Sequence, residues 1–206
     1  MPHGDREPGH RPLALLAEQY GMPASTLQRI AALIVLWGTF EGDLEKALWR
    51  FGGEDPSGKR PTTDKMQLSE KLARFRELAG GSEDTDWAEI VGLIYDVAAN
   101  LKAYRDTIVH GRLLPASVGG GFVLNTAWYG EQRKRPGSVA HIDDRLVGIM
   151  LDGLHELMGV MAALAHGDRA PHIVARVLSR RDSLKKAKTN TGEIIHLTEL
   201  MNSDTY

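Results

Sequence analysis

Arg105, Asp106 and His110 lie close together in the segment 104–111, which reads Tyr-Arg-Asp-Thr-Ile-Val-His-Gly. A histidine can exchange protons near neutral pH because its ordinary pKa is about 6.5. An arginine stays charged and can bind two phosphate oxygens at once. These groups suit RNA cleavage without a metal, in which a base removes the 2′-hydroxyl proton and an acid protonates the leaving 5′-oxygen. The arginine would stabilise the extra negative charge of the phosphorane, and Asp106 would fix the tautomer of His110.

The segment 104–111 closes a predicted amphipathic helix over about residues 82–113. At about 100° per residue, one face of this helix carries apolar core residues, and Asp106 and His110 point away from that face as an i, i+4 pair. The outward face is mixed in polarity, and it comprises Tyr95, Ala99, Lys102, Asp106, Val109, His110 and Leu113. This mixture favours a second subunit, and a homodimer is the usual form. The alternative is a long surface helix with a few exposed apolar residues.

One histidine cannot easily act as acid and base in the same step, whereas two copies of His110 across a dimer could. The Arg-x4-His spacing by itself carries little weight, because 16 arginines and 8 histidines in 206 residues produce such a pair by chance about as often as not. The other features are the informative ones. Asp106 directly follows the arginine, Gly111 directly follows the histidine, and the motif stands at the end of the third predicted helix.

Together these features resemble the HEPN superfamily, whose members carry an Arg-x4–6-His motif with a polar residue, often Asn, Asp or His, after the arginine. The resemblance covers about residues 25–167, and it includes residues typical of the opening helix of uncharacterised bacterial members, namely Trp37, Phe40, Glu41, Leu44 and Leu48. It implies a mainly α fold, an antiparallel four-helix up-and-down bundle, and a homodimer with the two motifs in a cleft at the interface.

In active members of this superfamily the cleft is a metal-independent ribonuclease, often a toxin or a phage-defence effector. The resemblance therefore implies a catalytic set of Arg105, His110 and Asp106 that cleaves single-stranded RNA or tRNA, with Tyr104 in support. It also implies a possible antitoxin or regulatory protein as a partner. Other members act as non-catalytic modules that bind RNA, a nucleotide or a protein, and this remains the alternative.

Glu41 is a second supporting candidate, because a carboxylate on the apolar side of a helix needs a partner or incurs a desolvation cost. Arg105 could supply that partner, or Glu41 could reach water at the end of the bundle. The helix that carries Glu41 is predicted over about 25–51, capped by Ser25 or Thr26. Its apolar stripe is Ile30, Leu33, Ile34, Trp37, Leu44, Leu48 and Phe51.

Two more helices are predicted, over about 64–79 and 143–166, and a small β-hairpin over about 117–142 precedes the last of them. The bundle thus spans residues 24–167, between a loose N-terminal arm (1–23) and a basic tail (168–206). The tail either contacts RNA phosphates or is a solvated or disordered segment. The candidate RNA-binding residues are Lys102, Arg112, Arg180, Arg181, Lys185 and Lys186.

The composition excludes several classes of protein. The net charge of −2 argues against binding polyanions over the whole surface, and the absence of cysteine excludes a disulfide framework or a thiol nucleophile. The longest apolar stretch, 30–38, is too short to span a bilayer, so we expect a cytoplasmic protein without membrane contact. No cofactor or metal is expected. His141 with Asp143 and Asp144 resembles a metal cluster, but an aspartate there better suits a helix cap.

Overall fold

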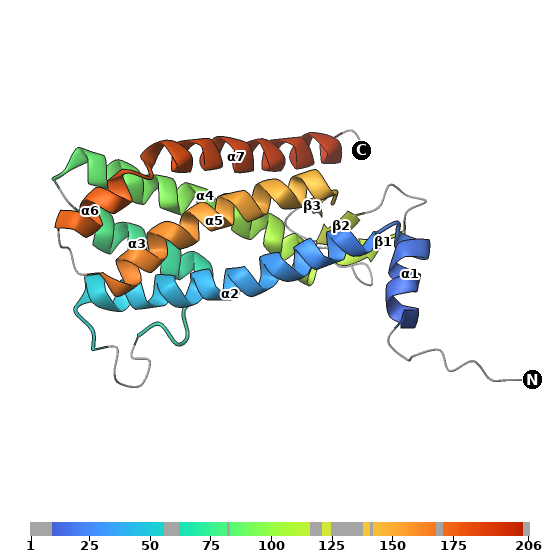
Figure 1. Cartoon of the computed structure of the whole chain (residues 1–206), viewed down its shortest axis with the longest axis horizontal. Coiled ribbons are helices and arrows are strands. Elements are labelled where there is room, and N and C mark those ends of the chain that lie inside the picture. The colour runs from blue at the N-terminus through green and yellow to red at the C-terminus, as the bar shows by residue number, and fades with distance from the viewer. Residues whose placement is uncertain are drawn as a thin grey trace, which may run out of the picture.

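The computed structural model describes residues 10–55, 62–81, 83–115, 121–124, 138–140, 142–167 and 171–203. The fold is mainly helical (Figure 1). Its helices are α1 (His10–Tyr20), α2 (Ala24–Gly52), α3 (Leu68–Gly80), α4 (Thr85–His110), α5 (Asp144–His166), α6 (Pro171–Leu178) and α7 (Arg181–Ser203). The strands are β1 (Arg112–Leu114), β2 (Gly121–Leu124) and β3 (Ser138–Ala140).

The hydrophobic core lies between α2, α3, α4 and α5, where the apolar stripes of these helices meet. Its largest fully buried side chains include Trp37, Phe40, Phe75, Ile94 and Leu157. The helical period predicts most of the α2 stripe, because only residues three or four positions apart can face the same core. Ile34 is the exception: the prediction places it in the stripe, yet 41% of its surface is exposed.

The N-terminus of α2 is held by another helix rather than by its own cap. The predicted capping role of Ser25 or Thr26 is wrong, because Pro23 is the N-cap and no side chain caps the helix. The hydroxyls of Ser25 and Thr26 instead donate to the carboxylate of Asp144 in α5, at 3.3 Å and 2.5 Å. Asp143 caps α5 by accepting from the Leu146 N–H at 2.7 Å, as the sequence predicts for this pair of aspartates.

The connection between α2 and α3 is fixed by a buried polar cluster. Thr63 donates to Glu45 at 2.5 Å and accepts from the Trp49 indole at 2.9 Å, and Lys71 of α3 lies 3.3 Å from Glu45. These contacts keep the residues before Gln67 out of a helical conformation. Gln67 is the N-cap of α3 and forms a capping box with Glu70. Helix α3 therefore begins at Leu68 and not at the predicted position 64.

Helix α4 ends at His110, because Gly111 leaves the helix in an extended conformation. Arg112 and Leu113, predicted on the last turn of that helix, lie in β1 instead. Strand β1 pairs antiparallel with β2, and β2 pairs antiparallel with β3, in a sheet of order β1-β2-β3. The rest of the predicted hairpin, including 125–130 and His141, lies outside the described residues.

Residues 10–20, for which an irregular arm is predicted, form α1. Gly21 follows with a φ of 63°, a left-handed conformation that suits glycine, and its N–H donates to Ala17. Most side chains described in α1 are exposed. The remainder of the predicted arm, 1–9, is outside the described residues.

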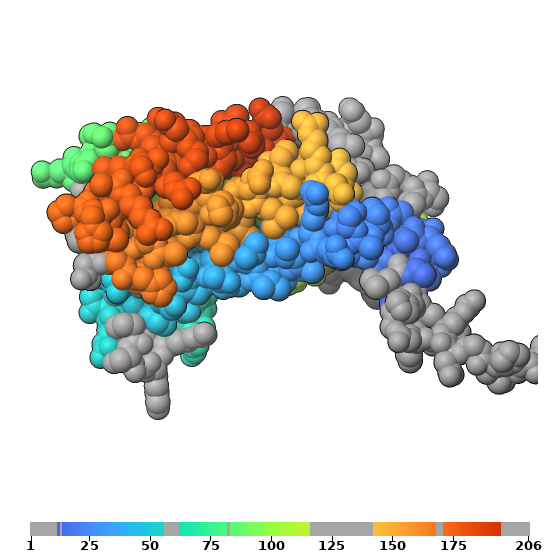
Figure 2. Space-filling model, viewed as in Figure 1, coloured from blue at the N-terminus to red at the C-terminus, as the bar shows by residue number. Residues whose placement is uncertain are grey.

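Residues 171–203, for which a basic tail is predicted, form α6 and α7, and α7 packs along α4 and α5. Figure 2 shows α7 and α6 beside α5 and α2 on one face of the molecule. The inward residues of α7 recur at helical spacing and are buried: Leu184, Ala187, Thr191 and Ile194. This segment is thus part of the hydrophobic core as well as a carrier of positive charge.

Helix α5 is long and apolar enough to cross a membrane by length and composition alone, with a mean hydropathy of 1.4 over its most apolar window. Its apolar residues are largely used inside the fold, since Val147, Met150, Leu154, Leu157 and Met161 are fully buried against the neighbouring helices. A core helix meets the same length and composition criteria as a membrane span.

Candidate functional site

Arg105 lies on the flank of α4 that faces α2. One guanidinium nitrogen is 2.9 Å from Asp106 Oδ1, and the guanidinium carbon stands 6.0 Å from the centre of the Trp37 ring. The side chain is 22% exposed. Its Nε atom is buried and has no hydrogen-bond partner among the described residues. The carboxylate and the indole thus hold the guanidinium in one position, with part of its surface open to a ligand.

Asp106 binds two cations. Lys102 donates to Oδ2 at 2.6 Å, and Arg105 donates to Oδ1 at 2.9 Å. Burial raises the pKa of Asp106, but the hydrogen bonds from Lys102 and Arg105 outweigh burial and hold the pKa of this carboxyl below its ordinary value. In the described part of the chain no hydrogen bond joins Asp106 to His110; the carboxylate accepts from Lys102 and Arg105 instead.

The lowered pKa of Asp106 predicts an acid-dependent contribution to stability. A depressed carboxyl pKa stabilises the fold above the unfolded-state pKa of about 3.9, and this contribution is lost as the pH falls through the lower folded-state pKa. The wild type should therefore exceed Asp106→Asn in unfolding free energy at neutral pH, and the gap should shrink below about pH 4. Urea unfolding at neutral pH and below about pH 4 measures this difference in unfolding free energy. The control is Asp152→Asn, an exposed position on α5; a gap for Asp106→Asn that did not change with pH would contradict the assignment.

His110 is the last residue of α4, and its side chain is exposed. It belongs to a strip of partly exposed residues along α4, which we call the open stripe: Tyr95, Ala99, Lys102, Asp106 and His110. Arg105 lies five positions before His110, about 7.5 Å along the helix axis. The C-terminal end of α4 therefore carries both a guanidinium and an exposed imidazole, which point in directions about 140° apart around the helix axis.

Glu41 contacts Trp37 rather than Arg105. Its Oε1 accepts from the indole N–H at 2.6 Å, and among the described residues no ion pair joins Glu41 to Arg105. Trp37 therefore binds Glu41 through its N–H and supports Arg105 with its ring face. Sequence reasoning missed this role of Trp37. The available signal was the carboxylate four residues after a tryptophan, a spacing at which two helical side chains meet.

Tyr104 is buried in the core and does not line the open stripe. Burial, followed by the charge of Asp143, raises the pKa of its hydroxyl well above the ordinary value. A hydroxyl in this state stays protonated near neutral pH. Tyr104 thus packs behind the motif, and its predicted supporting role stays a prediction.

The predicted RNA-binding residues do not form one surface. Lys102 belongs to the Asp106 cluster, and Arg112 is exposed in β1. Of the four candidates that lie in α7 or directly before it, three form ion pairs within the fold. Arg180 pairs with Glu156 at 3.2 Å, Arg181 with Asp86 and with Glu89 at 3.1 Å, and Lys185 with Glu89 at 2.8 Å. Lys186 is exposed beside a cavity between α5 and α7.

The carboxylates that bind α7 come from the first half of α4, and they neutralise much of the positive charge expected of a free tail. Lys188 adds a further pair with Asp96 at 2.7 Å. The hydrogen bond from Lys185 is the largest factor holding the pKa of Glu89 below its ordinary value. Most of the described cations of α7 are therefore paired with carboxylates, and little unpaired positive charge remains there to bind a polyanion. The open stripe of α4 is the better candidate for a site.

Exposed apolar side chains lie near Arg105. Val109 is 38% exposed, one turn after Arg105, and Ile34 is 41% exposed, one turn before Trp37. Helices α2 and α4 run in opposite directions (Figure 1), so both residues lie on the same side of the Trp37–Arg105 contact. Apolar groups exposed next to a polar cluster are typical of a surface covered by a partner.

Comparison of the chain with protein-family models, with curated proteins and with solved structures found no match. Among the described residues, no group of three or more histidine, aspartate or glutamate side chains could hold a metal ion.

Proposed function

We propose that this chain is a HEPN-like endoribonuclease that cleaves single-stranded RNA or tRNA as a homodimer, with Arg105, Asp106 and His110 from each subunit. The observation that carries the proposal is the paired geometry at the end of α4. The last turns of α4 carry a guanidinium held by Asp106 and Trp37 and, five residues later and about 140° around the helix, an exposed imidazole. The proposal takes α2, α3, α4 and α5 as an antiparallel up-and-down bundle, with a hairpin inserted before α5.

The proposed reaction divides its proton transfers between two subunits. His110 of one subunit removes the 2′-hydroxyl proton, and the 2′-oxygen attacks the adjacent phosphorus. His110 of the other subunit gives a proton to the 5′-oxygen as the bond from phosphorus to that oxygen breaks. The products are a 2′,3′-cyclic phosphate and a 5′-hydroxyl. The two Arg105 guanidinium groups stabilise the charge of the phosphorane, and Asp106 keeps each guanidinium in place.

A second subunit is required because each chain supplies one His110 at this position. The apolar groups beside the motif, Ile34 and Val109, supply contact area for that subunit, and α2 and α4 carry them on the side where Arg105 and Trp37 meet. In a two-fold dimer the same patch meets itself, which would bring the two motifs together.

We expect Ile34→Glu to convert the dimer into a monomer and to lower RNA cleavage in parallel, since it would place like charges opposite each other in the interface. Light scattering measures the molecular mass. Val35→Glu is the matched control, because Val35 is 70% exposed and lies about 160° around α2 from Trp37. If Val35→Glu dissociated the dimer and Ile34→Glu did not, the interface would lie on another face.

The alternative is a HEPN-like module that binds RNA, a nucleotide or a protein without cleaving it. One observation favours this alternative: Arg105 and Asp106 already form an ion pair within the chain, so the cluster can stabilise the fold without any substrate. One assay distinguishes the two functions: cleavage of RNA by purified protein in excess chelator. Cleavage that depends on His110 supports the enzyme, and binding without cleavage supports the module.

A toxin or phage-defence role follows from the same proposal. A ribonuclease of this kind needs a neutralising partner, and an antitoxin or regulatory protein that covers the open stripe would prevent RNA from reaching His110. Such a partner would be recognised by its protection of Lys102 and His110 from chemical modification.

A further inference from the structure

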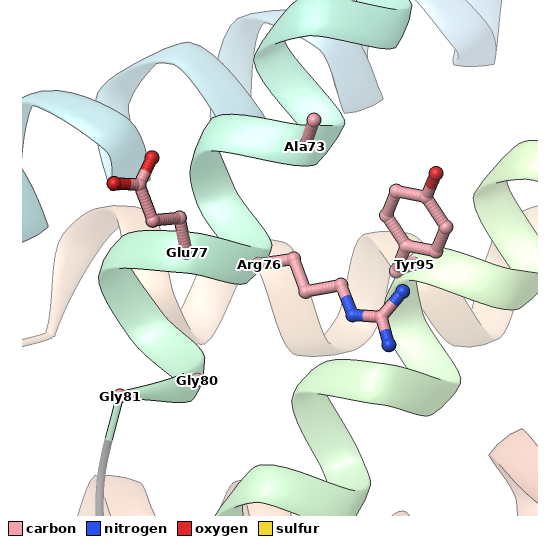
Figure 3. A pocket seen from close by; sticks show the side chains of 6 residues that line it. All are labelled: Ala73, Arg76, Glu77, Gly80, Gly81 and Tyr95. Carbon is pink, nitrogen blue, oxygen red and sulfur yellow. The ribbon is translucent and has the colours of Figure 1, made fainter.

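A shallow cavity of ≈470 Å³ lies between α3 and α4, away from the Arg105–His110 motif. Figure 3 shows its lining, which consists of Ala73, Arg76, Glu77, Gly80, Gly81 and Tyr95. Three of these residues are glycine or alanine, so the space is bounded by backbone and by few side-chain atoms. The longer side chains of Arg76 and Tyr95 meet across it.

The Arg76 guanidinium lies over the Tyr95 ring, with its central carbon 5.0 Å from the ring centre. In the described part of the chain no hydrogen bond or ion pair engages this guanidinium. The contact with the ring uses none of the guanidinium N–H groups, so they stay free for a bidentate contact with phosphate. The ring thus positions Arg76 to bind an anion.

The acids near this guanidinium are engaged elsewhere. Glu77 points away from Arg76 (Figure 3) and pairs with Arg74 at 2.7 Å. Asp96, the residue after Tyr95, pairs with Lys188 of α7 at 2.7 Å. Arg76 therefore contributes a positive charge that these two carboxylates do not neutralise.

Tyr95 is also the first residue of the open stripe that ends at His110. The two positions differ by about 60° around α4 and by about 22 Å along it. At the ~3.4 Å spacing of a stacked strand, this distance corresponds to about seven nucleotides. Lys102 stands between them on the same stripe, so a strand bound at His110 could follow α4 to Arg76.

We propose that the Arg76–Tyr95 pair is a distal subsite that binds a backbone phosphate of single-stranded RNA, several nucleotides from the bond held at the Arg105–His110 motif. The inference rests on the proposed ribonuclease function and extends it to the length of substrate that the enzyme recognises. A short oligonucleotide bound at the motif does not reach this subsite, whereas a longer one does.

The test compares the affinities of a ten-nucleotide RNA and a dinucleotide for full-length protein in a His110→Ala background, in which the RNA stays intact. Arg76→Ala should lower the ratio of the two affinities about 3- to 10-fold, the size of one exposed charged contact. It should also reduce the salt dependence of ten-mer binding by about 0.7 in the log–log slope, which corresponds to one phosphate. Tyr95→Phe keeps the ring and should retain the ratio, while Tyr95→Leu should lower it.

Lys46→Ala is the matched control, since it removes one exposed cation of α2 that does not line the cavity, and it should leave the ratio unchanged. An unchanged ratio and salt slope in Arg76→Ala, with ten-mer binding intact, would overturn the subsite and leave the proposed function standing. If the protein bound neither RNA at any salt concentration, the proposed function and the subsite would both be contradicted.

Discussion

Replacing His110 with alanine is expected to slow RNA cleavage by at least about 10²- to 10⁴-fold, the usual contribution of one general acid or base. In the proposed reaction the loss affects both proton transfers, because each dimer loses its base and its acid at once. The substitution should leave the fold intact, since the His110 side chain is exposed and its backbone contacts do not depend on the imidazole. Initial rates on a labelled RNA in excess chelator measure the effect.

His155→Ala is the matched control for this prediction. His155 is another exposed helical histidine, on α5, and it lies outside the Arg105–Asp106 cluster. Its loss should leave the cleavage rate unchanged. Equal losses in the two variants would assign the effect to a general change in the protein rather than to His110.

Leu184→Ala is expected to lower the free energy of unfolding by about 2–5 kcal/mol, the range for a leucine removed from a packed core. Leu184 has 0% exposure and lies on the side of α7 that packs along α4 and α5. A chain with a loose basic tail at these residues would lose almost nothing. Urea unfolding monitored by helical circular dichroism gives the comparison.

Lys186→Ala tests the same helix at an exposed position two residues away, and it should change the free energy of unfolding by no more than about 0.5 kcal/mol. If Leu184→Ala were as mild as Lys186→Ala, α7 would not belong to the cooperative core, and its ion pairs with α4 would be incidental contacts.

The period of apolar residues was sufficient to predict α2, α4 and α5 within a few positions, because burial on one side of a helix leaves a repeating signal in the sequence. It could not identify α7 as a packed helix. The apolar residues of α7 are outnumbered by lysines and polar groups, and the carboxylates that pair with its cations lie about ninety residues earlier in the chain. Such pairs leave no local pattern.

The placement of the candidate residues on α4 was predictable from the sequence, and their contacts were less so. The outward placement of Asp106 and His110 follows from counting turns along α4. The partners of Glu41 and Asp106 depend on which neighbouring group comes nearest, and that is decided by side-chain packing. Trp37 and Lys102 therefore occupy the carboxylates that sequence reasoning assigned to Arg105 and His110.

The central claim is a site completed by two subunits, with one His110 from each. It can be tested by mixing wild type with the His110→Ala variant at constant total concentration, letting the subunits exchange, and measuring RNA cleavage in excess chelator. If each site needs both histidines, activity follows the square of the wild-type fraction, and an equal mixture retains about one quarter of it. A linear decline, with about one half retained, would contradict the shared site, as would the absence of cleavage by the wild type.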